Sequence, residues 1–194
     1  MTIYALSSGP GLSGIAVIRV SGTQSREIIS SLTDQPFPKE RLATLKKIKN
    51  NSNNELIDEG IVLWLPGPKT YTGEDMVEFH VHGSKAVINE MQNVISKFKD
   101  CRLAEPGEFT KKAFHNGKIN LLKAESIGDL IASETELQRK QALRIMTGES
   151  SKKFEKWRDD LIEILGNVEA KIDFPEEDIS DDIYKQIKTK IEKI

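Results

Sequence analysis

The sequence predicts an α+β domain, a mixed sheet with helices, followed by an all-α helical segment. Over residues 1–118, β-branched or alternating apolar runs are interleaved with helical patterns, which is typical of a domain that packs helices on a sheet. From residue 119 to residue 194, apolar residues recur at helical spacing. We therefore expect two domains, residues 1–118 and residues 119–194.

Four segments predict the strands of the sheet. Residues 60–65 form a continuous apolar run, which favours a central strand, and residues 42–48 predict an edge strand with solvated lysines at positions 46, 47 and 49. Residues 15–20 are β-branched and end at a Ser-Gly pair. Residues 76–82 alternate with period 2, with one face of Val77, Phe79 and Val81 and an opposite face of Met76, Glu78, His80 and His82.

Helical patterns fill the remaining regular segments. Residues 23–32 predict a helix with Thr23 as a possible cap, and residues 87–98 predict a second one. In the C-terminal segment, Asn120 is a suitable N-cap for one long helix that continues to Met146 and stops at Gly148. A further helix covers residues 154–172.

A last helix is expected from about Ser180, with Ile183, Ile187 and Ile191 on one face. The sequence ends at Ile194 inside that pattern, without a capping residue. We expect from this that the 194 residues are part of a longer protein.

Composition excludes several classes of protein. The 28 Lys and Arg residues are balanced by 30 Asp and Glu, so a strongly basic nucleic-acid-coating protein is excluded, although a local basic patch is not. The sequence contains no apolar run long enough to span a membrane, and its N-terminus lacks a signal-peptide pattern. A single cysteine, Cys101, cannot form an intrachain disulfide. We expect a soluble cytoplasmic protein.

Two glycine motifs bear on nucleotide binding. Residues 9–14 match G-x-G-x-x-G, but a β-branched run follows where a dinucleotide site needs a helix, so a flexible loop is the better interpretation. The P-loop motif G-x-x-x-x-G-K-[ST] does not occur in the sequence.

Other polar residues leave alternatives open. Glu78, His80 and His82 share a strand face and form either a metal site or the polar wall of a sheet or pocket. Arg19, after an apolar run, is either an edge residue or a fork for a carboxylate or phosphate. Cys101 has no evident catalytic partner, which favours an incidental thiol over a nucleophile.

Three glycine-marked segments, residues 71–75, 106–110 and 116–118, are either solvated turns or loops that carry binding residues. Together with their neighbours they resemble the MnmE (TrmE) family of tRNA modification GTPases. The resemblance rests on six motifs in order: Gly-Ile-Ala-Val-Ile-Arg-Val-Ser-Gly (14–22), Tyr-Thr-Gly-Glu-Asp-Met-Val-Glu (71–78), His-Gly (82–83), Ala-Glu-Pro-Gly-Glu-Phe-Thr-Lys-Lys-Ala-Phe (104–114), Asn-Gly-Lys (116–118) and Ile-Asp-Phe-Pro-Glu-Glu (172–177).

The resemblance implies an N-terminal domain that dimerises and binds 5-formyl-tetrahydrofolate or a related reduced folate, followed by the first part of a helical domain. The G domain, inserted into the helical domain of this family, and the C-terminal helices are then absent from this chain, which explains the missing P-loop. Family folate contacts map to Arg19, Glu78 and Lys118. A carboxylate such as Glu78 suits the pterin edge, and a cation suits the glutamate tail.

The family resemblance also implies an activity for the full-length protein. GTP hydrolysis in the G domain, with potassium and magnesium, accompanies installation of an aminomethyl-type group on the wobble uridine of tRNA, with a homodimer and the FAD-dependent protein MnmG (GidA) as partners. We expect this chain to lack GTPase activity. A stand-alone folate-binding module or an aminomethyltransferase-like enzyme is the alternative.

Two positions depart from the family pattern, in which Asp is common where this sequence has Asn120 and Leu where it has His115. Asn caps a helix about as well as Asp, so we expect the fold to be unchanged. If the family Asp also orients Lys118, the folate affinity of this chain is lower.

Overall fold

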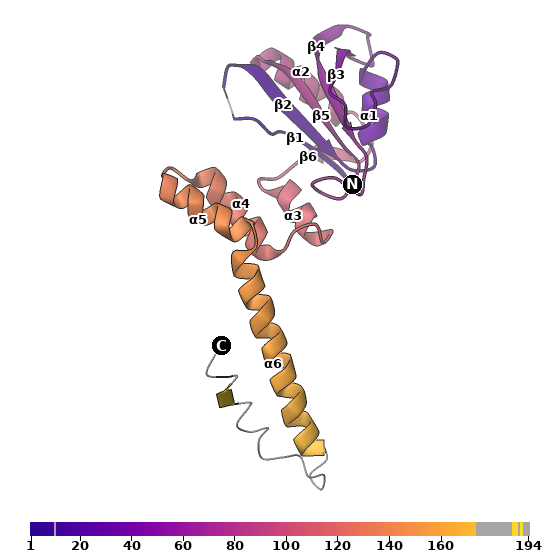
Figure 1. Ribbon diagram of the computed structural model, residues 1–194. Helices are drawn as coiled ribbons and strands as arrows, with labels where there is room; N and C mark the ends of the chain where they lie inside the picture. Colours follow the sequence, from indigo (N-terminus) through magenta and orange to yellow (C-terminus); the bar gives the residue numbers. More distant parts are fainter. Residues whose placement is uncertain (10, 174–187, 190, 192–194) are drawn as a thin grey trace. The chain divides into compact units, whose positions relative to one another are not determined.

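The computed structural model describes residues 1–9, 11–173, 188–189 and 191 (Figure 1). The chain divides into two compact units, Met1–Asn120 and Leu121–Ile194. The first unit contains a sheet with helices and the second contains helices, which confirms the predicted fold class.

The N-terminal unit is built on a six-stranded sheet of order β3-β4-β5-β2-β1-β6. Its neighbouring strands are antiparallel except β1 and β6, which are parallel, so the sheet is mixed. The predicted edge strand and the predicted interior strand are β3 and β4. The strands are β1 (Thr2–Leu6), β2 (Ser13–Ser21), β3 (Thr44–Lys49), β4 (Leu56–Leu65), β5 (Met76–Gly83) and β6 (Cys101–Leu103).

One face of the sheet carries the hydrophobic core. Helices α1 (Ser25–Leu32) and α2 (Lys85–Ser96) pack against the sheet (Figure 1). Their apolar side chains belong to the same buried cluster as alternate residues of the strands. The predicted face of Val77, Phe79 and Val81 lies in this cluster, as the period-2 pattern required. Fully buried members from the other elements are Ile18, Val20, Ile28, Ile29, Leu32, Ile48, Val62, Met91, Val94 and Ile95.

The opposite face of the sheet is polar at its centre. Arg19 of β2 and Glu78 of β5 are direct partners in the strand register, and Val17 and His80 form the next pair. Helix α3 (Glu108–His115) and residues 66–75 approach one end of this face through side-chain contacts with Arg19 and with β2. Sequence patterns did not predict α3, because the segment reads as a glycine-marked polar loop.

Two details of the N-terminal unit correct the sequence-based expectations. Helix α1 begins after Gln24, whose side chain makes no capping bond, so Thr23 is not its cap. Lys46 is not solvated. Its side chain is 5% exposed. Its ammonium donates hydrogen bonds to the backbone carbonyls of Asp34 and Pro36, which supply the acceptors that a buried ammonium needs.

The second unit contains three helices in its described part, α4 (Leu121–Ala132), α5 (Glu136–Met146) and α6 (Glu149–Asp173). The prediction of one helix from Asn120 to Met146 is wrong, because Thr135 is extended and starts a new helix. Its side chain accepts from the Gln138 N–H while the Gln138 side chain accepts from the Thr135 N–H, which is a capping box. Gly148 does end α5, with φ of 91°.

Helix α6 confirms the predicted helix over residues 154–172. The helix expected from Ser180 falls mostly on residues outside the described part of the chain, which are 174–187, 190 and 192–194. Among the helices that the structure describes, none is both long and apolar enough to cross a membrane.

Candidate functional site

The strand register brings together two of the three predicted site residues. Nε of the Arg19 guanidinium donates to Oε1 of Glu78 at 2.9 Å, and Nη2 of the same group lies 2.8 Å from that oxygen in the ion pair. Both side chains retain solvent contact, with exposed fractions of 29% for Arg19 and 16% for Glu78. Of the two interpretations of Arg19, the structure favours a guanidinium that binds a carboxylate over a solvated edge residue. Its carboxylate partner within the chain is Glu78.

Two aromatic rings flank the Arg19 guanidinium. Its central carbon lies 6.0 Å from the ring centroid of Tyr71 and 5.6 Å from that of Phe109, a range in which a cation is attracted to an aromatic face. The Tyr71 hydroxyl lies 2.8 Å from the Thr110 hydroxyl, which ties residues 66–75 to α3. The glycine-marked segments around Tyr71 and Phe109 thus meet at Arg19 on the polar face of the sheet.

The second oxygen of Glu78 has a weaker contact. His80 lies two residues further along β5 on the same face, and its Nε2 is 3.4 Å from Glu78 Oε2. A carboxylate oxygen accepts two hydrogen bonds, so Oε2 retains acceptor capacity for a donor that reaches it from the solvent side.

Lys118, the third predicted residue, lies on the turn that follows α3. Its aliphatic stem contacts Gly73, since a Cβ built at Gly73 comes within 3.3–3.4 Å of three carbons of the Lys118 side chain. The Lys118 N–H donates to Ala113 O at 2.8 Å, and Asn116 Nδ2 donates to Thr72 O at 2.7 Å. Lys118 therefore reaches the region through residues 72–73 rather than through direct contact with Arg19 or Glu78.

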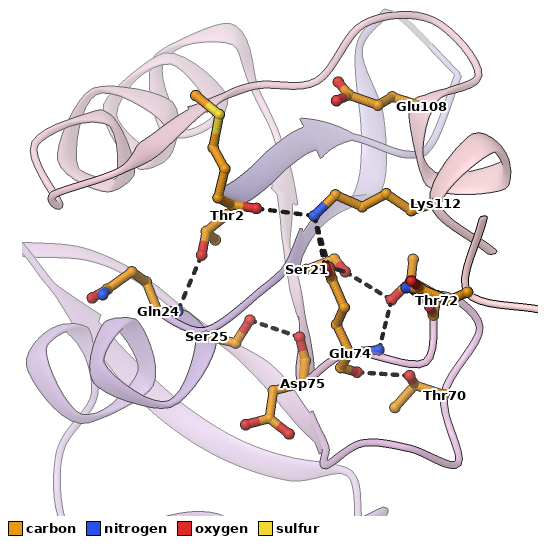
Figure 2. Close-up of polar contacts among 12 residues, drawn as sticks. Thr2, Ser21, Gln24, Ser25, Thr70, Thr72, Glu74, Asp75, Glu108 and Lys112 are labelled. Carbon is orange, nitrogen blue, oxygen red and sulfur yellow. Dashed lines mark hydrogen bonds and ion pairs between the residues drawn. The ribbon is translucent and has the colours of Figure 1, made fainter. Parts of the chain in front are cut away.

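A partly buried polar cluster supports the same segment, and the sequence did not predict it (Figure 2). The fully buried hydroxyls of Ser21 and Thr72 are 2.8 Å apart, and Ser21 also donates to Glu74 Oε2 at 2.8 Å. Lys112 of α3 donates to both oxygens of Glu74, at 3.0 Å and 2.8 Å, and to Met1 O at 2.9 Å. Partners 38 to 111 residues apart leave no local sequence signal.

The metal-site alternative for Glu78, His80 and His82 does not fit their contacts. His82 instead bonds Asp58, with its backbone N–H 2.7 Å from Oδ2 and its Nδ1 2.8 Å from Oδ1. Within the described residues, no group of three or more His, Cys, Asp or Glu side chains is arranged to hold a metal ion. The polar wall of a sheet is the interpretation that the contacts favour.

The two remaining candidates are structural. The third glycine of the motif at residues 9–14 lies in β2, so no helix N-terminus is present there to hold a pyrophosphate. Cys101 is half-buried at β6, where burial raises the pKa of its thiol despite a hydrogen bond with Thr2. A raised pKa keeps the thiol protonated, which disfavours a nucleophile.

Comparison with known families matches both units. The N-terminus of the GTP-binding protein TrmE matches residues 2–118, and the MnmE helical domain matches residues 121–194. The chain thus consists of the N-terminal and helical parts of a class of GTP-binding proteins. It belongs to the MnmE (TrmE) family of tRNA modification GTPases.

Individual relatives agree with the family. Over 97% of its own length, the chain is 63% identical to the tRNA modification GTPase MnmE of Pelagibacter ubique. Over all of its own length, it is 44% identical to the tRNA modification GTPase MnmE of Beijerinckia indica. It is 46% identical over 93% of its length to the mitochondrial 5-taurinomethyluridine-(tRNA) synthase subunit GTPB3 of Danio rerio. The chain spans 42%, 43% and 36%, respectively, of these relatives.

Proposed function

We propose that this chain binds a reduced folate of the 5-formyl-tetrahydrofolate type on the polar face of its sheet, as the N-terminal part of a tRNA-modifying GTPase. The observation that carries the proposal is the partly exposed Arg19–Glu78 pair, whose guanidinium lies near the rings of Tyr71 and Phe109. A charged pair, two aromatic rings and a nearby lysine form the mixed apolar and polar surface that a planar, anionic cofactor needs.

Glu78 is the residue that recognises the pterin ring in this proposal. A pterin presents ring N–H and amino groups along one edge, and Glu78 Oε2 retains capacity to accept from them. Arg19 holds Oε1 and thereby fixes the plane of the carboxylate. Lys118 extends from the rim of the same region, where its ammonium attracts the carboxylates of the folate tail.

The role of the whole protein is also a proposal. The relatives are named tRNA modification GTPases and a tRNA-modifying synthase subunit, and the chain matches them over 93–100% of its length. This favours a part of such a GTPase over a stand-alone folate module or an aminomethyltransferase-like enzyme. The folate then supplies the one-carbon unit for the wobble uridine of tRNA, with MnmG as the FAD-dependent partner.

Two further properties belong to this proposal. We expect the chain to form a homodimer through residues 1–118, which light scattering tests. A monomer mass at tens of micromolar contradicts it.

We also expect no GTP binding. Binding of GTP together with potassium and magnesium needs a phosphate-binding loop, and this sequence does not contain that motif. Saturable GTP binding in a calorimetric titration contradicts that expectation.

Calorimetric titration with 5-formyl-tetrahydrofolate tests the folate proposal. Arg19→Ala, Glu78→Ala and Lys118→Ala each remove a charged partner and are expected to weaken binding by about ten- to hundredfold. Arg26→Ala is the matched control, because Arg26 also stacks on an aromatic ring, that of Phe37 at 5.1 Å, but lies on α1. A folded wild-type chain that does not bind the ligand contradicts the proposal.

If the wild-type chain binds and the three variants bind equally well, the assignment of the residues is wrong. The far-ultraviolet circular dichroism of each variant establishes that a loss of affinity does not come from unfolding.

A further inference from the structure

Residues 72 and 73 connect the partly buried polar cluster of Ser21, Thr72, Glu74 and Lys112 with Lys118. The Thr72 hydroxyl lies in the cluster, while its carbonyl accepts from Asn116 at 2.7 Å. The next residue, Gly73, has φ of 82° and carries the stem of Lys118 on the side where a Cβ would lie. A shift of the backbone at residues 72–73 therefore displaces the surface on which Lys118 rests.

The hydrogen bonds of the cluster run in one direction. A carboxylate at Glu74 only accepts, so the Ser21 hydroxyl donates to it and is left to accept from Thr72. Thr72 in turn accepts from the Glu74 N–H at 3.3 Å, which closes the ring of bonds. Lys112 uses its three donors on both Glu74 oxygens and on Met1 O. Each polar atom of the cluster has a partner of the opposite kind.

The rest of the segment is fixed on both sides of Thr72. Thr70 Oγ1 donates to Glu74 O at 2.6 Å, and the carbonyl of Asp75 accepts from Ser25 Oγ at 2.9 Å (Figure 2). Tyr71 has its own anchor in the hydroxyl of Thr110. Loss of the charge on Glu74 is therefore expected to affect the side of the segment that carries Lys118 more than the side that carries Tyr71.

We propose that the Lys112–Glu74 ion pair, with Ser21 and Thr72, positions Lys118 for the anionic tail of the folate. The inference rests on the proposed folate site and names residues that act on it without touching the ligand. Lys118 is an exposed side chain, and a supporting surface limits the positions that its ammonium can take. A preorganised cation binds an anion with a smaller entropic cost.

Glu74→Gln is the variant that tests the pair. Both Glu74 oxygens accept from Lys112, so either orientation of the new amide places its NH2 group against the donors of that ammonium. We expect the affinity for 5-formyl-tetrahydrofolate to fall about tenfold, since a small displacement of a positioning group has effects of this order. Lys112→Met should weaken binding similarly, and Lys112→Arg should restore part of it.

Lys46→Met is the matched control for Lys112→Met. Lys46 is also a shielded ammonium bonded to carbonyl oxygens, but it lies on the edge strand β3. The Lys46→Met variant should have a lower thermal stability but an unchanged folate affinity. If Lys46→Met weakens binding as much as Lys112→Met does, general destabilisation explains both results and the positioning role is wrong.

A double-mutant cycle separates positioning from a direct or general effect. If Glu74 acts through Lys118, Glu74→Gln should change affinity less than about twofold in the Lys118→Ala background. A full tenfold loss in that background overturns the proposal, because the cluster would then act through another part of the site.

Amide hydrogen exchange gives a result that does not depend on the ligand. Glu74→Gln should speed exchange of the Lys118 N–H, which donates to Ala113 O, and Lys46→Met should not. Unchanged exchange at Lys118 in Glu74→Gln overturns the positioning role even if the folate binds. A wild-type chain that fails to bind folate contradicts the proposed function, while accelerated exchange still supports the positioning of Lys118.

Discussion

The N-terminal unit and the helical unit differ in where they keep their large apolar side chains. In the N-terminal unit, a cluster of buried residues from five strands and two helices forms one core between the sheet and its helices. In the helical unit, the described residues bury Ala142 and Ile164, while the stripe on α6 stays exposed. The exposed members of this stripe include Phe154, Leu161, Leu165, Val168 and Ile172.

This difference shows that amphipathic patterns of similar strength do not imply similar stabilisation. A pattern predicts which face of an element is apolar, whereas the free energy of burial depends on what covers that face. In the N-terminal unit, the covering elements are its own helices. In the described part of the helical unit, the α6 stripe is not covered, so a substitution there has little packing to lose.

The largest expected effect on the free energy of unfolding is seen when one buried and one exposed apolar residue are each replaced by alanine. Phe79→Ala removes a fully buried ring from the core and should lower the free energy of unfolding of the N-terminal unit by about 3–5 kcal/mol. Leu161→Ala removes a side chain that is 51% exposed on α6 and should cost less than about 0.5 kcal/mol. Chemical denaturation followed by circular dichroism measures both.

Similar costs for the two substitutions contradict the comparison. In that case, the α6 stripe is covered in solution, for instance by association of chains, and the cost of Leu161→Ala should then depend on protein concentration.

Two glycines extend the comparison to the backbone. A Cβ at Gly60 of β4 would lie 2.3 Å from the backbone oxygen of His80, so Gly60→Ala forces the sheet to shift and should cost about 1–3 kcal/mol. Gly166 of α6 has no atom within 4 Å of the equivalent position, and Ala is the better helix former. Gly166→Ala should therefore stabilise α6 by about 0.5–1 kcal/mol, read from amide exchange along the helix. Destabilisation by Gly166→Ala would show that this position is packed.

The sequence predicts those features that depend on neighbouring residues better than those that depend on contacts between distant residues. The faces of β5 were predicted because alternation is written into adjacent residues. The break before α5 was missed, although Thr135 and Gln138 have the spacing of a capping box and could have indicated it. The signal for this break is therefore present in the local sequence.

The candidate site was predicted only in part, because its contacts join distant residues. Arg19 and Glu78 are 59 positions apart, and only the register of β2 and β5 pairs them. The family resemblance predicted Arg19, Glu78 and Lys118 as site residues, but it did not predict which residues they contact. The positions of Glu74 and Lys112 follow from the packing of α3 on the sheet end, which no local pattern encodes.

A smaller effect is expected for two carboxylates that each begin a helix and pair with an arginine. Glu108 is 12% exposed, bonds the Arg102 guanidinium and also accepts from the Glu105 N–H at 2.8 Å. Glu108→Gln should cost on the order of 1 kcal/mol, because charged hydrogen bonds that are partly shielded from water are lost. Glu136 pairs with Arg139 but is 61% exposed, so Glu136→Gln should change thermal unfolding imperceptibly. Equal shifts in the two melting curves contradict this expectation.

The smallest expected effect is a pH dependence that only one of the two units shows. Burial alone would raise the pKa of Asp58, but the hydrogen bonds that it accepts from His82 and from the Glu59 N–H outweigh burial and lower it. A lowered pKa means that the folded state takes up the proton at lower pH than the unfolded chain, which does so near about pH 4. The stabilisation by Asp58 is therefore present above about pH 4 and is lost as the pH falls further.

Asp58→Asn should consequently be less stable than the wild type by about 0.5–1 kcal/mol at pH 6, and the difference should shrink towards pH 3. Glu136→Gln is the control from the helical unit. The bond from Arg139 lowers the Glu136 pKa as well, but this exposed pair is screened by water, so its curve should follow the wild type at every pH. Thermal unfolding of the three proteins between pH 6 and pH 3 measures the difference. If the gap between Asp58→Asn and the wild type stays constant over that range, the Asp58 carboxylate acts through its shape and not through its charge.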